Sequence, residues 1–380
     1  METQRSEDWR PRESLQVAFD SCVGAGETCD KDVWLKRVHS FRDLSVPMAL
    51  LSINRKRALG FRQRATHLHT RLRSHRLVDA AFAGLQDSVP RSAVLALHAR
   101  VEDVWPSAWK DPRFVQVWGP RGAVYVVPKD DVAVFTLGRL PRDPALGAAI
   151  HRAADKVRKA FLNRQTRGAH VPYEQTRRLS LHDLRSAAIT GTVRIDWDAS
   201  STTWWVVDPP VVEAEPARLE LACRFLRSLG PATAKEFAWW SGVLLSDARQ
   251  TFRSLERELT EVELDGRKSW VLRTDRAALE HAAASNTVRL LPPGDPYLAA
   301  GDRELLAPES RFRSELWPRS VWPGALMVDG ELVGTWRRRL GHVVVQPWRT
   351  IGAETKSSVE TEVLAMPVES TTKEIRWASP

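Results

Sequence analysis

The sequence predicts an α+β protein in which a unit of helices followed by a β-hairpin recurs three times, before a C-terminal segment of short strands. Two observations lead to this prediction. Apolar residues at helical spacing of three and four alternate with short runs of period two, and turn-forming dipeptides stand between paired runs. After Asn286 the helical spacing gives way to strands and turns. We expect this last segment to form a small β-barrel or sheet domain, and the fold class we predict has a β-barrel there.

The third unit, residues 214–286, shows the repeated pattern best. Gly230-Pro231 ends its first helix, Thr233 and Glu236 form a capping box at the start of the second, and Ser246 can cap the third. Asp265-Gly266 is a strong hairpin turn. The expected helices are Glu215–Leu229, Thr233–Trp240 and Asp247–Leu259, and the expected strands are Glu261–Leu264 and Lys268–Leu272. Three helices followed by a hairpin is the winged-helix pattern, a helix-turn-helix with a β-hairpin wing.

The same pattern places a first winged helix at residues 52–128 and a second at 129–213. In the first, helices are expected over Asn54–Arg64, His75–Ala83 and Pro90–Arg100, with strands Phe114–Trp118 and Ala123–Val127. In the second, helices are expected over Ala145–Asn163 and Leu181–Ile189, with a wing of Gly191–Trp197 and Thr203–Val207. The barrel-like domain covers residues 287–380, with strands Val288–Leu291, Ala325–Val328, Leu332–Arg337, His342–Gln346 and Glu374–Trp377 and a helix over Val359–Leu364.

Residues 1–51 carry charges of both signs and no sustained period, so we expect a poorly ordered extension with one helix over Asp30–Arg42. This start lacks the apolar stretch of a secretory signal, and no apolar run approaches the ~20 residues of a spanning helix. The three cysteines show no zinc-ligand spacing. We therefore expect a cytoplasmic protein with no structural metal and no membrane partner.

The composition favours a nucleic-acid partner. Hydrophobic residues make up 43% and charged residues 27% of the 380 residues, which is a globular mixture. The net charge is +9, and most of the 56 Lys and Arg residues are Arg, a planar bidentate phosphate binder. The glycine-rich loops that bind nucleotide phosphates are absent, as are the GxSxG and HExxH motifs of hydrolases.

Six segments resemble one family in content and order. They are Trp118–Val127, Phe135–Asp143, Thr190–Ala199, Leu229–Gly242, Val288–Pro308 and Val328–Arg339. Together they resemble the winged-helix DNA glycosylases of the AlkZ/YcaQ type, over about residues 52–380. The resemblance implies three tandem winged helices and a C-terminal β-barrel around duplex DNA, a role in base excision repair, and location at the nucleoid. It implies hydrolysis of the N-glycosidic bond of alkylated purines, including N7-alkylguanine and some interstrand crosslinks, with no cofactor and no lyase step.

The resemblance also implies a catalytic motif in the first winged helix, Gln-x-Gln in one branch and Gln-x-Asp in the other, with x apolar. The matching residues here are Gln86, Asp87 and Ser88. Asp87 stands at the apolar position and Ser88 at the second polar one, so the motif departs from the family pattern at both.

The chemistry suits this motif because an N7-alkylated guanine is cationic and already leaves readily. The amide of Gln86 can accept a hydrogen bond from the attacking water and donate to the sugar or phosphate. The carboxylate of Asp87 can stabilise a cationic sugar and take a proton, and Ser88 can orient water at short range. Alternatively, Asp87 or Ser88 caps the helix that begins near Pro90.

Phosphate contacts are expected from clustered Arg and Lys residues without nearby acids, from the wing tips, and from the run after the Asp329-Gly330 hairpin. The candidate DNA-binding residues are Arg55, Arg57, Arg62, Arg64, Arg71, Arg73, Arg121, Arg177, Arg178, Arg194, Arg267, Lys268, Arg337, Arg338 and Arg339. His67, His69 and His75 lie among them without a Cys or carboxylate beside them, so no metal site is predicted.

Two adjacent tryptophan pairs, Trp204-Trp205 and Trp239-Trp240, are expected to place one ring in the core and leave the other partly exposed.

The leading hypothesis is a monomeric DNA glycosylase acting on damaged double-stranded DNA. Two other hypotheses remain open. A winged-helix array can serve as a non-catalytic regulator or damage sensor, because fold does not fix function. The basic faces can also be buried against protein partners in a scaffold. The environment of Gln86 discriminates between the first two: an amide that faces an open DNA cleft with a water site favours the enzyme, and an amide bound to buried backbone groups favours the binder.

Overall fold

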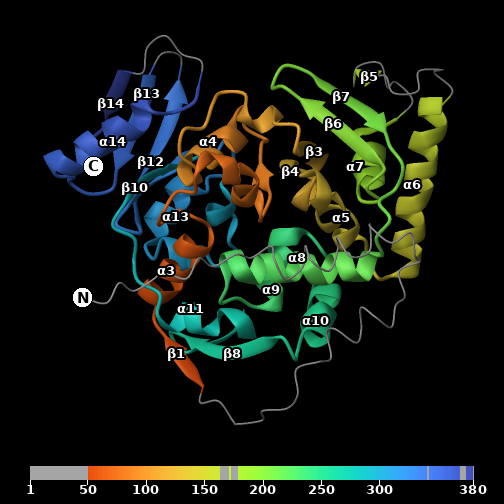
Figure 1. Cartoon of the computed structure of the whole chain (residues 1–380), viewed down its shortest axis with the longest axis horizontal. Coiled ribbons are helices and arrows are strands. Elements are labelled where there is room, and N and C mark those ends of the chain that lie inside the picture. Colours follow the sequence, from red (N-terminus) through yellow and green to blue (C-terminus); the bar gives the residue numbers. More distant parts are fainter. Residues whose placement is uncertain (1–49, 163–170, 173–178, 340–341, 369–373, 380) are drawn as a thin grey trace. The chain divides into compact units, whose positions relative to one another are not determined.

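The computed structural model describes residues 50–380, except 163–170, 173–178, 340–341, 369–373 and 380. It confirms a mixed α+β protein, built on three sheets (Figure 1). Most of the expected N-terminal extension, including the helix expected over Asp30–Arg42, lies outside the described residues.

The third unit follows its local sequence signals. Its elements are α8 (Ala214–Leu229), α9 (Ala234–Ser241), α10 (Leu245–Ser254), β8 (Leu259–Leu264) and β9 (Arg267–Leu272), followed by η7 (Arg273–Asp275) and α11 (Arg276–Glu280). The capping box forms, because the Thr233 hydroxyl accepts from the Glu236 N–H while the Glu236 carboxylate accepts from the Thr233 N–H. The expected cap at Ser246 is wrong, since α10 begins one residue earlier, at Leu245, and Ser246 lies within its first turn.

The start of the first unit joins the sheet of the third. β1 (Leu51–Ile53) pairs in parallel with β8, giving a sheet of order β1-β8-β9. Asn54 then caps α3 (Arg55–Ala65) by accepting from the Arg57 N–H. α3 lies against α8 and α11. A Cβ at Gly60 would come within 2.3 Å of the Ala283 carbonyl oxygen, so only glycine permits this approach.

The hairpins of the first two units form one sheet of order β2-β4-β3-β6-β7-β5. Its strands are β2 (Leu85–Gln86), β3 (Phe114–Trp118), β4 (Val124–Pro128), β5 (Val171–Pro172), β6 (Val193–Trp197) and β7 (Thr202–Val206). Gln116 of β3 lies opposite Ile195 of β6, and this pairing joins the two hairpins.

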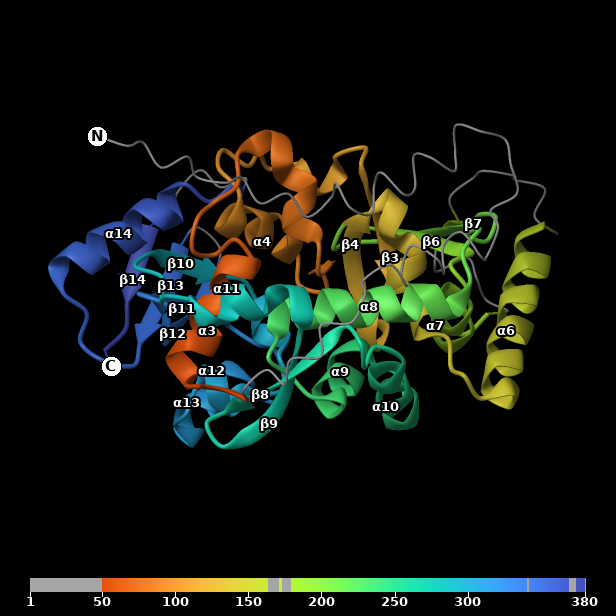
Figure 2. The same ribbon diagram turned by 60° about the horizontal axis from the view of Figure 1, so that its bottom comes forward.

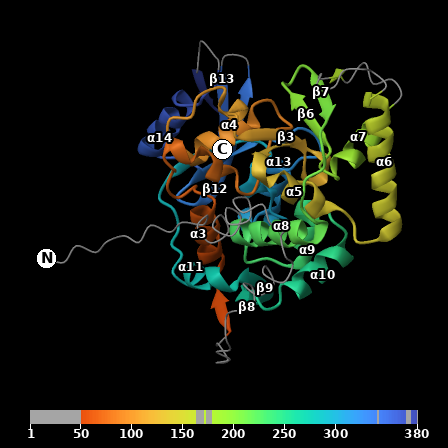
Figure 3. The same ribbon diagram turned by 45° about the vertical axis from the view of Figure 1, so that its right-hand side comes forward.

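Helices and short 3₁₀ turns surround this sheet, and Figure 3 shows α6 and α7 beside β6 and β7. They are η1 (Ser74–Ala81), α4 (Ser92–Arg100), η2 (Ala108–Lys110), η3 (Pro120–Gly122), η4 (Lys129–Asp131), α5 (Val132–Phe135), η5 (Leu137–Arg139), α6 (Pro144–Leu162) and α7 (Leu181–Ala188). The α-helix expected over His75–Ala83 is the 3₁₀ segment η1, because Arg76 leaves the helical region at φ −94° and ψ 20°.

The C-terminal sheet is open within the described residues, so the expected closed barrel is wrong. Its order is β10-β11-β12-β13-β14, and β14 pairs in parallel with β13 rather than returning to β10. The strands are β10 (Val288–Leu291), β11 (Gly324–Val328), β12 (Glu331–Arg339), β13 (His342–Pro347) and β14 (Glu374–Trp377). The helices of this part are η8 (Pro296–Ala299), α12 (Arg303–Leu306), α13 (Ser310–Leu316) and α14 (Ala353–Leu364), of which α14 packs on β10 (Figure 2).

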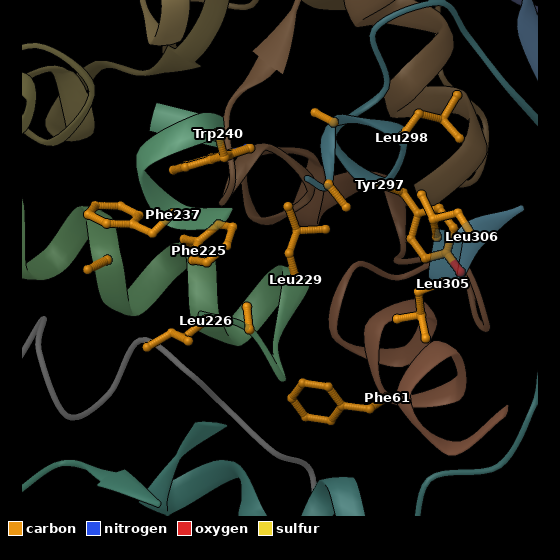
Figure 4. Close-up of a cluster of buried hydrophobic side chains, with 14 of the residues drawn as sticks. Phe61, Phe225, Leu226, Leu229, Phe237, Trp240, Tyr297, Leu298, Leu305 and Leu306 are labelled. Atoms are coloured by element: carbon orange, nitrogen blue, oxygen red, sulfur yellow. The ribbon is translucent and has the colours of Figure 1, made fainter. Parts of the chain in front are cut away.

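Two buried clusters connect these parts. In the first, aromatic residues of α8 and α9 pack with Tyr297 and the leucines of α12 (Figure 4). The ring centroids of Phe225 and Trp240 are 5.4 Å apart. In the second, α4 packs with the five-stranded sheet and α14. The helix that follows the candidate motif, α4, therefore packs against the C-terminal part of the chain.

Candidate functional site

Gln86 lies on the two-residue strand β2, at the edge of the six-stranded sheet. It pairs with Tyr125 of β4. A Cβ on Gly294 would lie 3.0 Å from the Gln86 side-chain carbon Cδ, so this glycine packs directly against the amide. The Gln86 Oε1 atom is buried and has no hydrogen-bond partner among the described residues. The amide oxygen is therefore not bonded to a backbone group, and it is not exposed at the surface of the described chain either.

Asp87 is fully buried and caps the next helix. Its Oδ1 accepts from the Ala93 N–H at 2.9 Å, and its Oδ2 accepts from Gln116 Nε2 at 3.2 Å. Asp87 therefore accepts from an N–H of the first turn of α4, as a capping group does, although the residue at the N-cap position is Arg91. Burial raises its pKa to about 7, since two hydrogen bonds and nearby Arg91 only partly offset desolvation.

Ser88 is exposed and does not cap the helix. Its hydroxyl accepts from the Val124 N–H at 3.3 Å, which ties the motif to β4 a second time. Because Asp87 takes the capping bond, the hydroxyl of Ser88 remains at the surface beside Gln86.

Gln116 is a site residue that the sequence analysis missed. Its Oε1 accepts from the Trp197 N–H at 2.6 Å, and its Nε2 donates to the Trp197 carbonyl as well as to Asp87. It is 5% exposed. A polar residue in the middle of the apolar strand FVQVW was the available signal. Gln116 connects the motif to the end of β6.

Two arginines flank the loop after the motif. Arg91 adopts a left-handed backbone at φ 67°, lies 4.6 Å over the Trp109 ring and donates to the Asp198 carbonyl. Arg338 of β12 donates to the Pro90 carbonyl at 3.2 Å. Burial and the charge of Arg91 lower the pKa of Arg338. The two positive charges thus lie close enough to interact with each other at the loop that follows the motif.

Comparisons with known proteins identify the family of this chain. The family model described as "DNA glycosylase AlkZ-like" matches residues 80–366, which include the motif and every strand of the three sheets except β1 and β14. The chain belongs to the AlkZ-like DNA glycosylase family. The interstrand DNA cross-link repair glycosylase of Streptomyces sahachiroi is 32% identical over 151 residues. That alignment spans 38% of this chain and 39% of the relative's length.

A solved structure supports the fold. The DNA glycosylase AlkZ of Streptomyces sahachiroi superposes with a TM-score of 0.72 at 19% identity, covering 86% of this chain and 100% of that one. At this identity the likeness shows the shared fold alone. The AlkZ-like architecture is therefore established independently of the motif residues.

Several cations expected to contact phosphate are engaged inside this AlkZ-like chain. Arg62 is 1% exposed and forms a bidentate ion pair with Asp302, so its expected DNA contact is wrong. Arg55 forms a bidentate pair with Glu331, and Arg71 pairs with Glu362. These three side chains stabilise contacts between distant segments, because their acidic partners lie more than 200 residues away in sequence.

The other candidates divide into exposed and engaged side chains. Arg57, Arg64, Arg121, Arg337, Arg338 and Arg339 are exposed. Arg73 pairs with Glu102, Arg267 with Glu236 and Lys268 with Glu261, at the surface. Arg194 donates to the Gly191 carbonyl at 2.6 Å, and burial lowers its pKa to about 10. Arg177 and Arg178 lie outside the described residues.

Over the described ranges, three or more His, Cys, Asp or Glu side chains never converge as a metal site would require. No helix there has the length and apolar character to cross a membrane.

Replacing Gly294 by Ala is expected to disturb the Gln86 amide. The new Cβ would press on the Gln86 side chain, and glycine's φ of +75° is unfavourable for alanine by about 1–2 kcal/mol. We expect base excision to fall by about 10-fold or more through misplacement of the amide. Single-turnover rates check this, with Gly352→Ala as the control, because nothing lies near a Cβ at that glycine. An unchanged rate would show that Gln86 does not need this contact.

The buried carboxyl of Asp87 is expected to make stability fall as pH rises. Its pKa is raised from 3.8 unfolded to about 7 folded, so between these values the folded state holds more protons. The stability that comes from protonating Asp87 in the folded state is fully present below about pH 4 and is lost by about pH 7. It amounts to a few kcal/mol in order of magnitude. Denaturant unfolding of wild type and Asp87→Asn at pH 5 and pH 8 measures it. Relative to wild type, Asp87→Asn should be more stable at pH 8 than it is at pH 5. A stability difference that does not change with pH would contradict the raised pKa of Asp87.

Proposed function

We infer that the protein is a monofunctional DNA glycosylase that hydrolyses the N-glycosidic bond of alkylated purines in duplex DNA. The observation that carries this inference is the buried Gln86 Oε1, which has no hydrogen-bond partner in the described chain and lies beside an exposed Ser88. Family membership supplies the reaction class, and this amide oxygen has its hydrogen-bonding capacity left over within the described chain.

The proposed reaction needs no cofactor. The bond between C1′ and the base nitrogen breaks, and its electron pair neutralises the cationic N7-alkylguanine as it leaves. Water adds to C1′, and its proton passes to solvent or to a neighbouring base. Gln86 accepts a hydrogen bond from this water and holds it in line with the leaving base. Ser88 orients the water from the surface side.

In this proposal Asp87 acts through its charge and does not contact the substrate. Both of its oxygens are occupied by Ala93 and Gln116, so it does not touch the sugar. With a pKa of about 7 it is partly ionised at neutral pH, and its negative charge stabilises the cationic sugar through space. It also fixes the position of Gln86 through the helix it caps.

The proposed DNA surface uses the exposed cations. Arg57, Arg64, Arg121, Arg337, Arg338 and Arg339 remain in it, and Arg73, Arg194, Arg267 and Lys268 contribute charge at its edge. Arg55 and Arg71 are left out because of their ion pairs. We further propose that the units 52–128, 129–213 and 214–286 act as three winged helices that hold the duplex in a monomer at the nucleoid. The interstrand DNA cross-link named for the Streptomyces relative is a second proposed substrate.

A single-turnover assay on a duplex with one N7-methylguanine tests this function. The expected result is an abasic site in the methylated duplex and none in the unmodified duplex of the same sequence. Binding is measured in parallel at two salt concentrations. Salt-dependent binding without an abasic product would favour the non-catalytic DNA binder, and the absence of binding would refute both.

A further inference from the structure

Two arginines without acidic partners meet at one tryptophan ring. The guanidinium of Arg121, in η3, lies 4.6 Å from the centroid of the Trp239 ring. The guanidinium of Arg303, in α12, lies 5.3 Å from the same centroid. In the described part of the chain neither arginine forms an ion pair, unlike Arg55, Arg62 and Arg71. Two positive charges therefore lie near the same Trp239 ring, and neither is paired with a carboxylate in the described chain.

The surrounding side chains hold this arrangement in place. Arg303 also lies 4.9 Å over the Trp317 ring and 5.3 Å over the Trp322 ring. Its Nε is buried and has no hydrogen-bond partner among the described residues. Burial, with the charge of Arg121 as the second cause, lowers the pKa of Arg303. An anion between the two guanidiniums would relieve their repulsion.

The platform itself remains accessible. Trp239 is 37% exposed, whereas its neighbour Trp240 is 1% exposed in the core, as expected for this pair. Arg121 is exposed at the hairpin tip, with a left-handed backbone at φ 56°. The tip packs closely on the end of α9, since a Cβ at Gly242 would lie 3.2 Å from the Arg121 nitrogen. Helix α9 therefore fixes where the Arg121 charge is presented.

This cluster is continuous with the catalytic motif. Gln86 pairs with Tyr125 across β2 and β4. The hydroxyl of Tyr125 in turn interacts with the Arg121 guanidinium. Tyr125 thus links the cluster to the strand that pairs with Gln86.

We propose that Arg121, Arg303 and Trp239 form a phosphate site, with a stacking ring, for the DNA strand that leaves the catalytic motif. The two guanidiniums hold one backbone phosphate, and the exposed face of Trp239 packs on the adjoining sugar or base. Guanidinium groups bind phosphate oxygens in a bidentate manner, and aromatic rings accept any base. The proposal rests on the proposed function, because it assigns this surface to the same DNA substrate.

Salt-dependent binding to the methylated duplex tests the site. Each lost phosphate contact should lower the slope of log affinity against log salt by about 0.9. Arg121→Gln and Arg303→Gln are each expected to weaken binding by about 10-fold and to lower this slope, and the double variant should lower it by about 0.9, because the two guanidiniums share one phosphate. Arg303→Lys keeps the charge and should keep most of the slope. Arg349→Gln is the matched control, an exposed arginine with no ion pair in the described chain, and should change neither quantity.

Ethylation interference locates the contact on the DNA. In wild type, ethylating one phosphate near the lesion should block binding, and in Arg303→Gln that phosphate should no longer matter. If wild type binds and cleaves while both Gln variants keep its slope, this inference fails and the proposed function stands. If wild type neither binds nor cleaves, the proposed function fails and the phosphate site falls with it. If the Gln variants melt at a lower temperature but keep the wild-type slope of log affinity against log salt, the cluster stabilises the fold and does not bind phosphate.

Discussion

Replacing Gln86 by Ala should lower base excision by at least about 100-fold while duplex affinity changes by less than about 3-fold. The change removes the amide that holds the attacking water, and positioned hydrogen-bonding groups at a reacting water contribute about this much. The Gln86 oxygen has no partner in the described chain, so its loss leaves no buried donor unsatisfied there. The fold should therefore persist. Single-turnover excision of N7-methylguanine and equilibrium binding measure the two quantities.

The matched control for this variant is Gln346→Ala, on β13. That side chain donates to the Ser379 carbonyl, away from the motif. It should leave excision unchanged. If Gln86→Ala excises at the wild-type rate, the motif assigned at Gln86 is not the catalytic one.

The second large effect is expected from Asp295→Ala, with a loss of about 3–5 kcal/mol in unfolding free energy. Asp295 accepts two hydrogen bonds from Arg100, each at 2.7 Å, and a third from the Tyr297 N–H. Its side chain is fully buried and that of Arg100 is 2% exposed. Removing the carboxylate leaves a buried guanidinium charge without a counter-ion. Urea unfolding at pH 7 measures the loss.

The same substitution should also slow excision in the fraction that remains folded, because Asp295 follows Gly294, which packs on Gln86. Arg73→Gln is the control, since Arg73 is 77% exposed in its pair with Glu102. It should change stability by less than about 1 kcal/mol. Replacing Arg100 by Met together with Asp295→Ala should cost less than the sum of the two single changes. A loss below about 1 kcal/mol for Asp295→Ala would contradict the importance of this pair.

The sequence predicted best those elements whose signals are local. The capping box at Thr233 and Glu236 and the Asp265-Gly266 turn act within a few residues, and both formed. The cap at Ser246 failed because a hydroxyl next to a helix start can sit in the first turn as well as before it. β2 was missed since a strand of two residues has no period to detect.

The features that could not be predicted depend on partners far away in the sequence. A closed barrel would require the last strand, β14, to pair with the first strand of the sheet, β10. Instead β14 pairs in parallel with β13. Arg62 looked like a phosphate ligand because no acid stands near it in the chain. Its acid is Asp302, 240 residues later. In the motif, the resemblance indicated Gln86, but only the fold reveals that Asp87 is buried beneath it and bonded to Gln116.

The pairing of β3 with β6 limits how the gene for this protein can vary. Gln116 is both the residue that faces Ile195 and the residue that bonds to Asp87. Inserting or deleting one codon in either strand would turn alternate side chains to the opposite face of the sheet and take Gln116 away from Asp87. Length changes in this region should therefore accumulate in the exposed turn at residues 198–201, where strand register is unaffected.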